Sequence, residues 1–169
     1  MTEQEFNTSI NGIRNHLICF AEGFATTGAA TPEDMVQEAV MRVWRLNYNG
    51  ETFRSIEAVS VAILKNICLD YIKLRKNQNH GAAGESKMIF IRSEYPSPEQ
   101  ALEAKDKIEL LKTYIKHLPA EHQVVLRLRD VMGYELDEIA VVLNTTQGNV
   151  RTMLSRARGK LRDYLLNCE

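Results

Sequence analysis

The segment from Glu135 to Arg162 concentrates side chains that could recognise nucleic acid. Its pattern predicts a short helix, a tight turn at Asn144-Thr145 and a longer helix that Thr146 caps. Asparagine and glutamine can pair with adenine and arginine with guanine, while hydroxyls and further cations can hold phosphates. The alternative is a surface helix whose charges are merely solvated. The outward side chains that could contact DNA are Thr146, Gln147, Asn149, Arg151, Thr152, Ser155, Arg156 and Arg158.

A second basic cluster lies between Lys65 and Lys76, where bases outnumber acids four to one. On a helix, such cations can form an electrostatic track for a DNA backbone. Asn66 and Asp70 stand four residues apart in the same segment, so they could contact DNA or form a structural hydrogen-bonded pair. The cations of the cluster are Lys65, Lys73, Arg75 and Lys76.

A polar stripe near the start of another predicted helix could bind a protein partner. Asp34, Gln37, Glu38 and Arg42 recur at spacings of three, one and four, which places them on one side of a helix. Val36, Val40 and Val43 would lie on the opposite side. The alternative is a capped and solvated helix N-terminus, because acids are favoured in the first turn whether or not a partner is present.

Catalytic and metal chemistry is weakly represented in this chain. His16 and Cys19 stand one helical turn apart, but a zinc site needs about four ligands at suitable spacing and no second pair exists. The three cysteines are odd in number and widely separated, which indicates free thiols. Gly81 and Gly84 lack the flanking strand and helix of a phosphate loop. We therefore expect no catalytic residue, no cofactor and no metal.

The overall composition is that of a globular protein. The 169 residues are 44% hydrophobic and 25% charged, with a net charge of −1. This length suits one domain or two small ones. No apolar run is long enough to span a membrane, and the first five residues are acidic where a secretory signal would be basic and then apolar. We expect a cytoplasmic protein without membrane insertion.

Three helices are predicted to position the first group of polar residues. Apolar spacing indicates a helix from Phe6 to Phe24 that stops near Gly28. Thr31-Pro32 signals the start of a second helix, which should run to about Leu46. A third helix should open near Ser55, with Val59, Ile63, Ile67 and Leu74 on its buried face. Residues 1–76 would form one small domain.

The remaining chain predicts a flexible linker and a second helical domain. Residues 77–96 lack clear periodicity, and a structureless stretch of that length is typical of a linker. Residues 97–169 then contain four helical patterns. They begin at Ser97-Pro98 and Leu118-Pro119, near Leu136 and at Thr146. The predicted class is all-α, with two small domains, the second of which contains a helix-turn-helix.

These segments together resemble extracytoplasmic-function (ECF) sigma factors, the initiation subunits of bacterial RNA polymerase. Leu118-Pro119, Glu138-Ile139-Ala140, Gly148–Arg151 and Ser155–Arg162 look like their region 4, which binds the promoter −35 element. Residues 32–45 resemble the region 2 helix placed against the polymerase clamp, and residues 64–73 the helix that faces the −10 element. The resemblance implies core polymerase, promoter DNA and an anti-sigma factor as partners. It also implies that the −35 and −10 residues are those of the two basic segments.

Within this family, an unstacked −10 base is held by the loop before the third helix and by nearby aromatic side chains. Here that loop is Asn47 to Arg54, so the resemblance adds Tyr48, Asn49 and Phe53 to the −10 residues. Val59 and Val61 stand where relatives often carry aromatic residues. Gln123 and Met153 also depart from the family pattern, which indicates an unusual promoter preference.

Two other functions compete with this interpretation. A stand-alone helix-turn-helix regulator would bind operator DNA without polymerase, and its promoter affinity would be high in the absence of core enzyme. A metal-dependent enzyme would carry metal after purification. We expect neither property.

Overall fold

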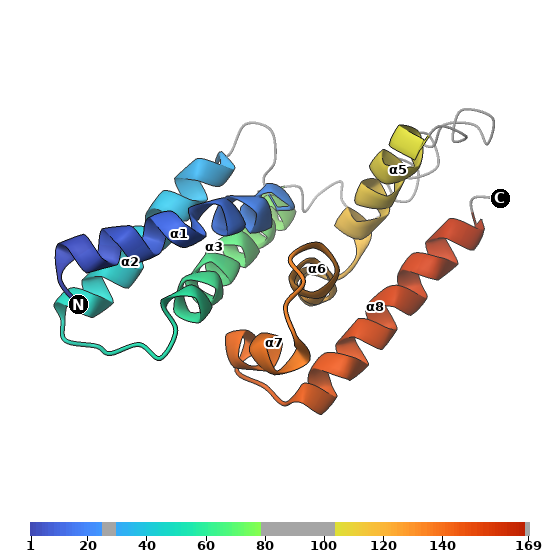
Figure 1. The fold of residues 1–169 in the computed structure, drawn as a ribbon. Coiled ribbons are helices and arrows are strands. Elements are labelled where there is room, and N and C mark those ends of the chain that lie inside the picture. The colour runs from blue at the N-terminus through green and yellow to red at the C-terminus, as the bar shows by residue number, and fades with distance from the viewer. Residues whose placement is uncertain (25–29, 79–103, 168–169) are drawn as a thin grey trace.

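The computed structural model describes residues 1–24, 30–78 and 104–167, without the side chains of 75–78 and 104–108. All the elements in these ranges are helices (Figure 1), which confirms the predicted all-α class. In chain order they are α1 (Glu3–Glu22), α2 (Pro32–Tyr48), α3 (Ile56–Gln78), α5 (Ala104–His117), α6 (Ala120–Leu126), the π-helical turn η2 (Arg127–Val131), α7 (Leu136–Leu143) and α8 (Gln147–Asn167).

One predicted domain boundary, between residues 76 and 77, lies within α3, and the other, between residues 96 and 97, falls outside this description. The expected linker at 77–96 lies outside the described residues except for 77–78, which complete α3. The expected helix start at Ser97 also lies outside them. We refer to α1, α2 and α3 as the N-terminal group and to α5, α6, η2, α7 and α8 as the C-terminal group.

Local capping determines where α1 and α2 begin. Thr31 accepts a hydrogen bond from the amide of Asp34 at 3.1 Å, and the Asp34 carboxylate accepts one from the amide of Thr31. Together with Pro32 at the first helical position, this capping box confirms the predicted start of α2. Thr2 and Glu5 form the same arrangement at the start of α1.

The predicted end of α1 near Gly28 is wrong, because the helix ends at Glu22. Gly23 follows it, and its amide donates to the carbonyl groups of the last turn. The side chain of Arg127, from the C-terminal group, occupies the space that a Cβ at position 23 would need. A contact distant in the sequence therefore accompanies the end of this helix. Phe24 is nevertheless buried, as its spacing predicted.

The helix-turn-helix of the C-terminal group has the expected local geometry. Glu135 and Glu138 form a capping box at the start of α7. Asn144 adopts the left-handed conformation at φ 51°, ψ 52° that ends α7, as predicted. Thr146 then accepts a hydrogen bond from the amide of Asn149 at 3.1 Å, which confirms its role as the cap of α8. Gly133, at φ 73°, makes the turn after η2.

One hydrophobic core runs through both groups. Phe20, Met35 and Leu64 from the N-terminal group belong to the same buried cluster as Leu128 and Ile139 from the C-terminal group. In Figure 1, α3 lies between α1 and α2 on one side and α6 and α7 on the other. The sequence predicted two domains, and the structure packs the corresponding groups against each other.

Gln123 is buried beneath the start of α6 and connects it to the end of α5. Its side-chain amide donates to the carbonyl oxygens of Lys116 at 3.2 Å and Leu118 at 2.8 Å. Met153 is also partly buried against the core. These two departures from the family pattern therefore have packing roles in this chain.

Gln123→Ala is expected to lower the free energy of unfolding by about 1–3 kcal/mol, because two carbonyl groups at the end of α5 lose their donor. Urea denaturation followed by circular dichroism measures this change. Gln4→Ala, at an exposed site on α1, is the control and should stay within about 0.5 kcal/mol of the wild type. Equal stability of the two variants would contradict a structural role for the Gln123 amide.

Candidate nucleic-acid interface

Helix α8 separates a buried face from a polar outer face. Val150, Leu154 and Ala157 are buried in the core. The eight residues predicted for −35 recognition are all exposed, which places them together on the outer side of the helix-turn-helix. The predicted −35 residues thus form a continuous polar strip along the N-terminal half of α8. Such a strip is the part of a recognition helix that reaches base edges.

Hydrogen bonds within the first turns hold some of these side chains in place. The Asn149 amide nitrogen donates to the Thr145 hydroxyl at 2.8 Å, and the Thr152 hydroxyl donates to the Gly148 carbonyl at 3.0 Å. Asn149 is therefore oriented by the turn that precedes α8. Its carbonyl oxygen stays available as an acceptor for the amino group of a base.

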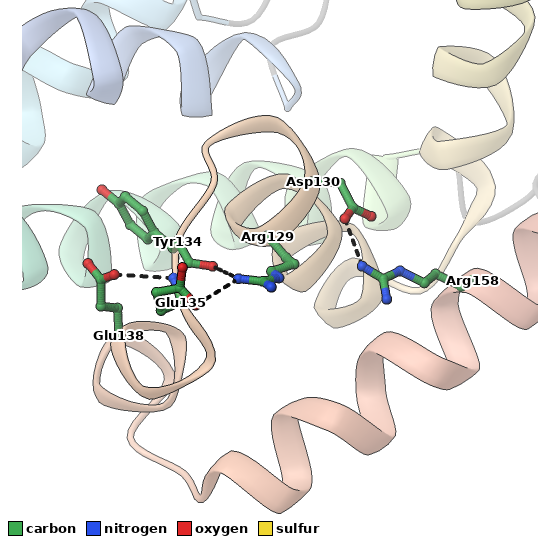
Figure 2. Close-up of polar contacts among 6 residues, drawn as sticks. All are labelled: Arg129, Asp130, Tyr134, Glu135, Glu138 and Arg158. Atoms are coloured by element: carbon green, nitrogen blue, oxygen red, sulfur yellow. Dashed lines mark hydrogen bonds and ion pairs between the residues drawn. The ribbon is translucent and has the colours of Figure 1, made fainter.

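Four arginines line a groove beside this strip. The groove has a volume of about 460 Å³, and Arg129, Arg151, Arg158 and Arg162 line it together with Ser155, Gly159, Leu136 and Leu154. Two of the arginines are tethered from η2 and its following turn, as Figure 2 shows. Arg129 donates to the Tyr134 carbonyl at 2.9 Å and pairs with Glu135 at 3.3 Å, and Arg158 pairs with Asp130 at 2.8 Å. The four arginines outnumber the two carboxylates that pair with them, so the groove keeps a net positive charge, which is suited to phosphate.

Sequence reasoning missed Arg129 and Arg162 as members of this groove. Arg162 follows Arg151 by eleven residues, or about three helical turns, so periodicity along α8 could have found it. Arg129 comes from a different element. Only the tertiary structure places it next to Arg158, through the packing of α6 against α8 and the ion pair of Asp130 with Arg158.

The residues predicted on α3 for −10 recognition differ in exposure. Asn66, Asp70 and Lys73 are exposed and recur at four and three, so they form a strip. Lys65 lies on the side facing α6, where burial lowers its pKa and Glu121 opposes that shift. Arg75 and Lys76 continue the helix, and their side chains are outside the described part of the chain. Lys65 is therefore partly buried, whereas Lys73 is exposed, and the role of these cations in −10 contact stays a prediction.

Asn66 and Asp70 do not pair with each other. Within the described ranges no hydrogen bond joins their side chains, so the structural-pair alternative finds no support. Asn66 instead lines a hollow of about 320 Å³ between α2 and α3. Its other lining residues are Arg42, Arg45, Leu46 and Ile63. An amide and two guanidinium groups around an apolar floor could hold an aromatic ring with polar edges.

The two aromatic residues predicted to hold a base occupy different environments. Tyr48 is 80% exposed at the end of α2, which extends two residues beyond the predicted end at Leu46. Asn49 caps that helix. Phe53 packs against the small core of Phe6, Ile10 and Val43. The Tyr48 ring is therefore available for stacking on a base, whereas part of the Phe53 ring is covered by its contacts with this core.

The polar stripe of α2 contains both capping and surface residues. Asp34 belongs to the capping box described above, and Glu38 forms an ion pair with Arg42 one turn later. Gln37 is exposed. Met41 lies between these side chains on the same face and is 49% exposed. Sequence analysis missed Met41, although its spacing of three from Glu38 could have revealed it.

No metal centre or membrane helix is found in the described residues. His16 contacts Glu57 at 3.4 Å, away from any cysteine cluster, and no group of three or more His, Cys, Asp or Glu side chains in these ranges could hold an ion. None of the described helices has the apolar length needed to cross a membrane.

Comparison with known proteins finds sequence similarity to RNA polymerase sigma factors. Residues 108–161 match the family model described as "Sigma-70, region 4". The ECF RNA polymerase sigma factor SigE of Mycolicibacterium smegmatis is 33% identical over 135 residues, which cover 79% of this chain and 51% of the relative. SigL of Mycobacterium tuberculosis is 28% identical over 139 residues, covering 81% of this chain and 76% of the relative.

A solved structure extends the likeness of fold across both helical groups. The sigma factor RpoE of Bartonella quintana, solved in complex with the anti-sigma factor NepR, superposes with a TM-score of 0.66 at 19% identity. That match covers 96% of this chain and 97% of the other. This chain spans about half the length of SigE. Its region 4 match, its relatives and its two helical groups agree: the chain is similar to ECF RNA polymerase sigma factors in sequence and in fold.

Proposed function

We propose that this protein is a transcription initiation factor that binds core RNA polymerase, directs it to specific promoters and promotes DNA opening. The observation that carries the proposal is the outer face of α8, where eight polar side chains stand exposed over a buried apolar stripe. The alternative, a surface helix whose charges are merely solvated, does not account for the arginine-lined groove beside α8. The similarity to sigma factors supports the same conclusion.

Each of the two helical groups would contact a different promoter element. We assign −35 recognition to region 4, residues 97–169, through the strip on α8. The four groove arginines would hold the adjacent backbone, because guanidinium groups bind phosphate in a fixed fork geometry. Residues 1–76 would form region 2, joined to region 4 by a linker at 77–96.

The −10 element would be contacted by α3 and the end of α2. The exposed strip of Asn66, Asp70 and Lys73 faces away from the C-terminal group, and the cations at the end of α3 would add phosphate contacts. The hollow lined by Asn66 of α3 and Arg42 of α2 is a place where an unstacked base could be held. Tyr48, which could stack on such a base, is the last residue of α2.

Core polymerase would dock on the exposed face of α2. The polar side chains there form a rim around the exposed apolar side chain of Met41, which is the usual anatomy of a protein interface. The rim residues are Gln37, Glu38 and Arg42.

The RpoE neighbour was solved with an anti-sigma factor, so we propose such a partner here too. Because the proposed partner is RNA polymerase, we propose that the protein acts in the cytoplasm. Sigma factors are not enzymes, and we propose no catalytic activity.

Run-off transcription with purified core polymerase and a genomic template library tests this function. Transcripts that start at a shared pair of upstream elements, and only when the protein is added, are the expected result. A gel shift separates the rival regulator, because a sigma factor of this type binds promoters well only with core enzyme. Tight promoter binding by the protein alone, without stimulation of transcription, would favour the regulator.

Arg129→Gln with Arg162→Gln is expected to weaken −35 binding while leaving base preference unchanged. If each side chain neutralises one phosphate, the slope of log affinity against log salt should fall by about 0.9 per residue. Binding measured across a range of salt concentrations on matched and scrambled duplexes checks this. Arg14→Gln, on α1, is the matched control. An unchanged salt slope in the double variant would show that the groove does not contact the backbone.

A further inference from the structure

Thr145 belongs to the turn between α7 and α8, where its backbone is held on both sides. Its amide donates to the carbonyl oxygen of Ala140 at 2.9 Å. Asn144 before it ends α7 in the left-handed conformation, and Thr146 after it caps α8. This turn sets α7 against the start of α8 (Figure 1). The side chain of Thr145, which is half-buried, is therefore attached to a fixed piece of backbone.

The hydroxyl of Thr145 in turn holds the side chain of Asn149. The Nδ2 atom of Asn149 donates to Thr145 Oγ1 at 2.8 Å. Side chains on a helix lean toward its N-terminus, so this bond to a residue four positions earlier needs no unusual rotamer. The backbone amide of Asn149 also donates to the Thr146 hydroxyl at 3.1 Å. Asn149 is thus exposed to solvent but held at both its backbone and its side chain.

The bond to Thr145 leaves Asn149 with one acceptor and one donor for a base. A carboxamide nitrogen carries two hydrogens, and Thr145 uses one of them. The Oδ1 atom and the second hydrogen remain. An acceptor beside a donor complements the N6 amino group and N7 of adenine in the major groove, which together allow a bidentate contact. Guanine presents two acceptors there, so one of them would face Oδ1.

The reverse orientation of the same carboxamide would favour different bases. If Oδ1 of Asn149 accepted a bond from the Thr145 hydroxyl, both amide hydrogens would point away from the turn. Two donors suit the acceptors of guanine or the O4 atom of thymine. The direction of the bond between Thr145 and Asn149 therefore determines which kind of base the side chain prefers.

We propose that Asn149 reads adenine at one position of the −35 element, and that Thr145 is the positioning residue that sets this preference. The inference rests on the proposed initiation function. Thr145 precedes α8 and lies outside the strip predicted to contact DNA, so it acts through Asn149 and not through a base of its own. The end of α7 thereby contributes to sequence recognition, because Ala140 fixes the backbone of Thr145.

Holoenzyme binding to duplexes varied at each −35 position tests the proposal. Asn149→Ala identifies the position that this residue reads, where the wild type should prefer adenine and the variant should not. Thr145→Val removes the hydroxyl and keeps the branched shape of the side chain. It should lower discrimination at that position alone by about two- to twelvefold, because the carboxamide is no longer immobilised before binding.

Two further variants separate positioning from a general effect on the fold. Thr145→Ser restores the hydroxyl and should restore the preference for adenine. Thr8→Val is the matched control, because Thr8 is exposed on α1 and its hydroxyl also donates to a carbonyl four residues earlier. It should bind every duplex as the wild type does. A loss of affinity by Thr145→Val that is equal at all positions would show a structural role only and would overturn the proposal.

Nuclear magnetic resonance of the free full-length protein measures the orientation without DNA. The two Nδ2 protons of Asn149 should shift in Thr145→Val and stay in place in Thr8→Val; unchanged shifts in Thr145→Val would overturn the positioning role. An Asn149-dependent preference for a base other than adenine, or no such position, would overturn the base assignment. If wild-type holoenzyme shows no −35 preference at all, the proposed function fails together with that assignment, and the resonance shifts still decide whether Thr145 orients Asn149.

Discussion

Arg151→Ala is expected to lower affinity for the preferred −35 sequence by about 5- to 150-fold, the equivalent of the roughly 1–3 kcal/mol that one bidentate base contact contributes. Arg151 is exposed one turn into α8, beside the end of the helix that would enter the major groove. It also lines the arginine groove, so its guanidinium is directed to the side where DNA would lie. A scrambled duplex should lose much less affinity, because the contact depends on a base.

Lys160→Ala is the matched control for Arg151→Ala. Lys160 is an exposed cation nine residues further along the same helix, where only backbone contact is expected. Its loss should reduce affinity for matched and scrambled duplexes equally and reduce the salt dependence. Fluorescence anisotropy with holoenzyme, on duplexes varied at each −35 position, separates the two effects. Equal losses on both duplexes for Arg151→Ala would refute its assignment to base recognition.

Glu38→Lys with Met41→Lys is expected to weaken association with core polymerase by about 100-fold or more, which corresponds to roughly 3 kcal/mol. The first change reverses a charge on the rim of the proposed interface, and the second replaces its exposed apolar side chain by a cation. Both leave the Thr31–Asp34 capping box intact, so α2 should still form. Surface plasmon resonance against immobilised core enzyme measures the loss.

Asp163→Lys with Leu166→Lys provides the matched control. This pair also combines an exposed acid with an exposed apolar residue three positions later, but on α8. Its polymerase affinity should stay near that of the wild type, and circular dichroism of both doubles should match the wild type. Unchanged association of Glu38→Lys with Met41→Lys would remove α2 from the polymerase interface.

Local sequence signals predicted most of the helical architecture because they act within a few residues. Thr31, Pro32 and Asp34 specify the start of α2 through hydrogen bonds and a backbone angle that need no distant partner. Asn144 and Thr146 likewise specify the turn and the start of α8. The outer face of α8 was predictable for the same reason. Its buried stripe recurs at the helical period, so the polar residues between must face outward.

Periodicity was less informative for α3. It predicted Val59, Ile63, Ile67 and Leu74 as the buried face, but Leu74 is 56% exposed and Val61, Leu64 and Cys68 are fully buried. A helix covered on two sides has apolar residues around much of its circumference, so no single stripe identifies the core. The second covering surface belongs to a segment more than forty residues away.

The sequence alone therefore decided the class, the helix starts and the side of α8 that faces outward, since each depends on neighbours within one or two helical turns. Only tertiary structure decided which cations act together. Packing of α6 against α8, with the ion pair from Asp130 of η2 to Arg158, brings Arg129 beside Arg158, and packing of α3 against α6 partly buries Lys65. Arg127 ends over Gly23 for the same reason. These placements result from burying one continuous core, whose contacts join residues about a hundred positions apart and leave no periodic trace in the chain.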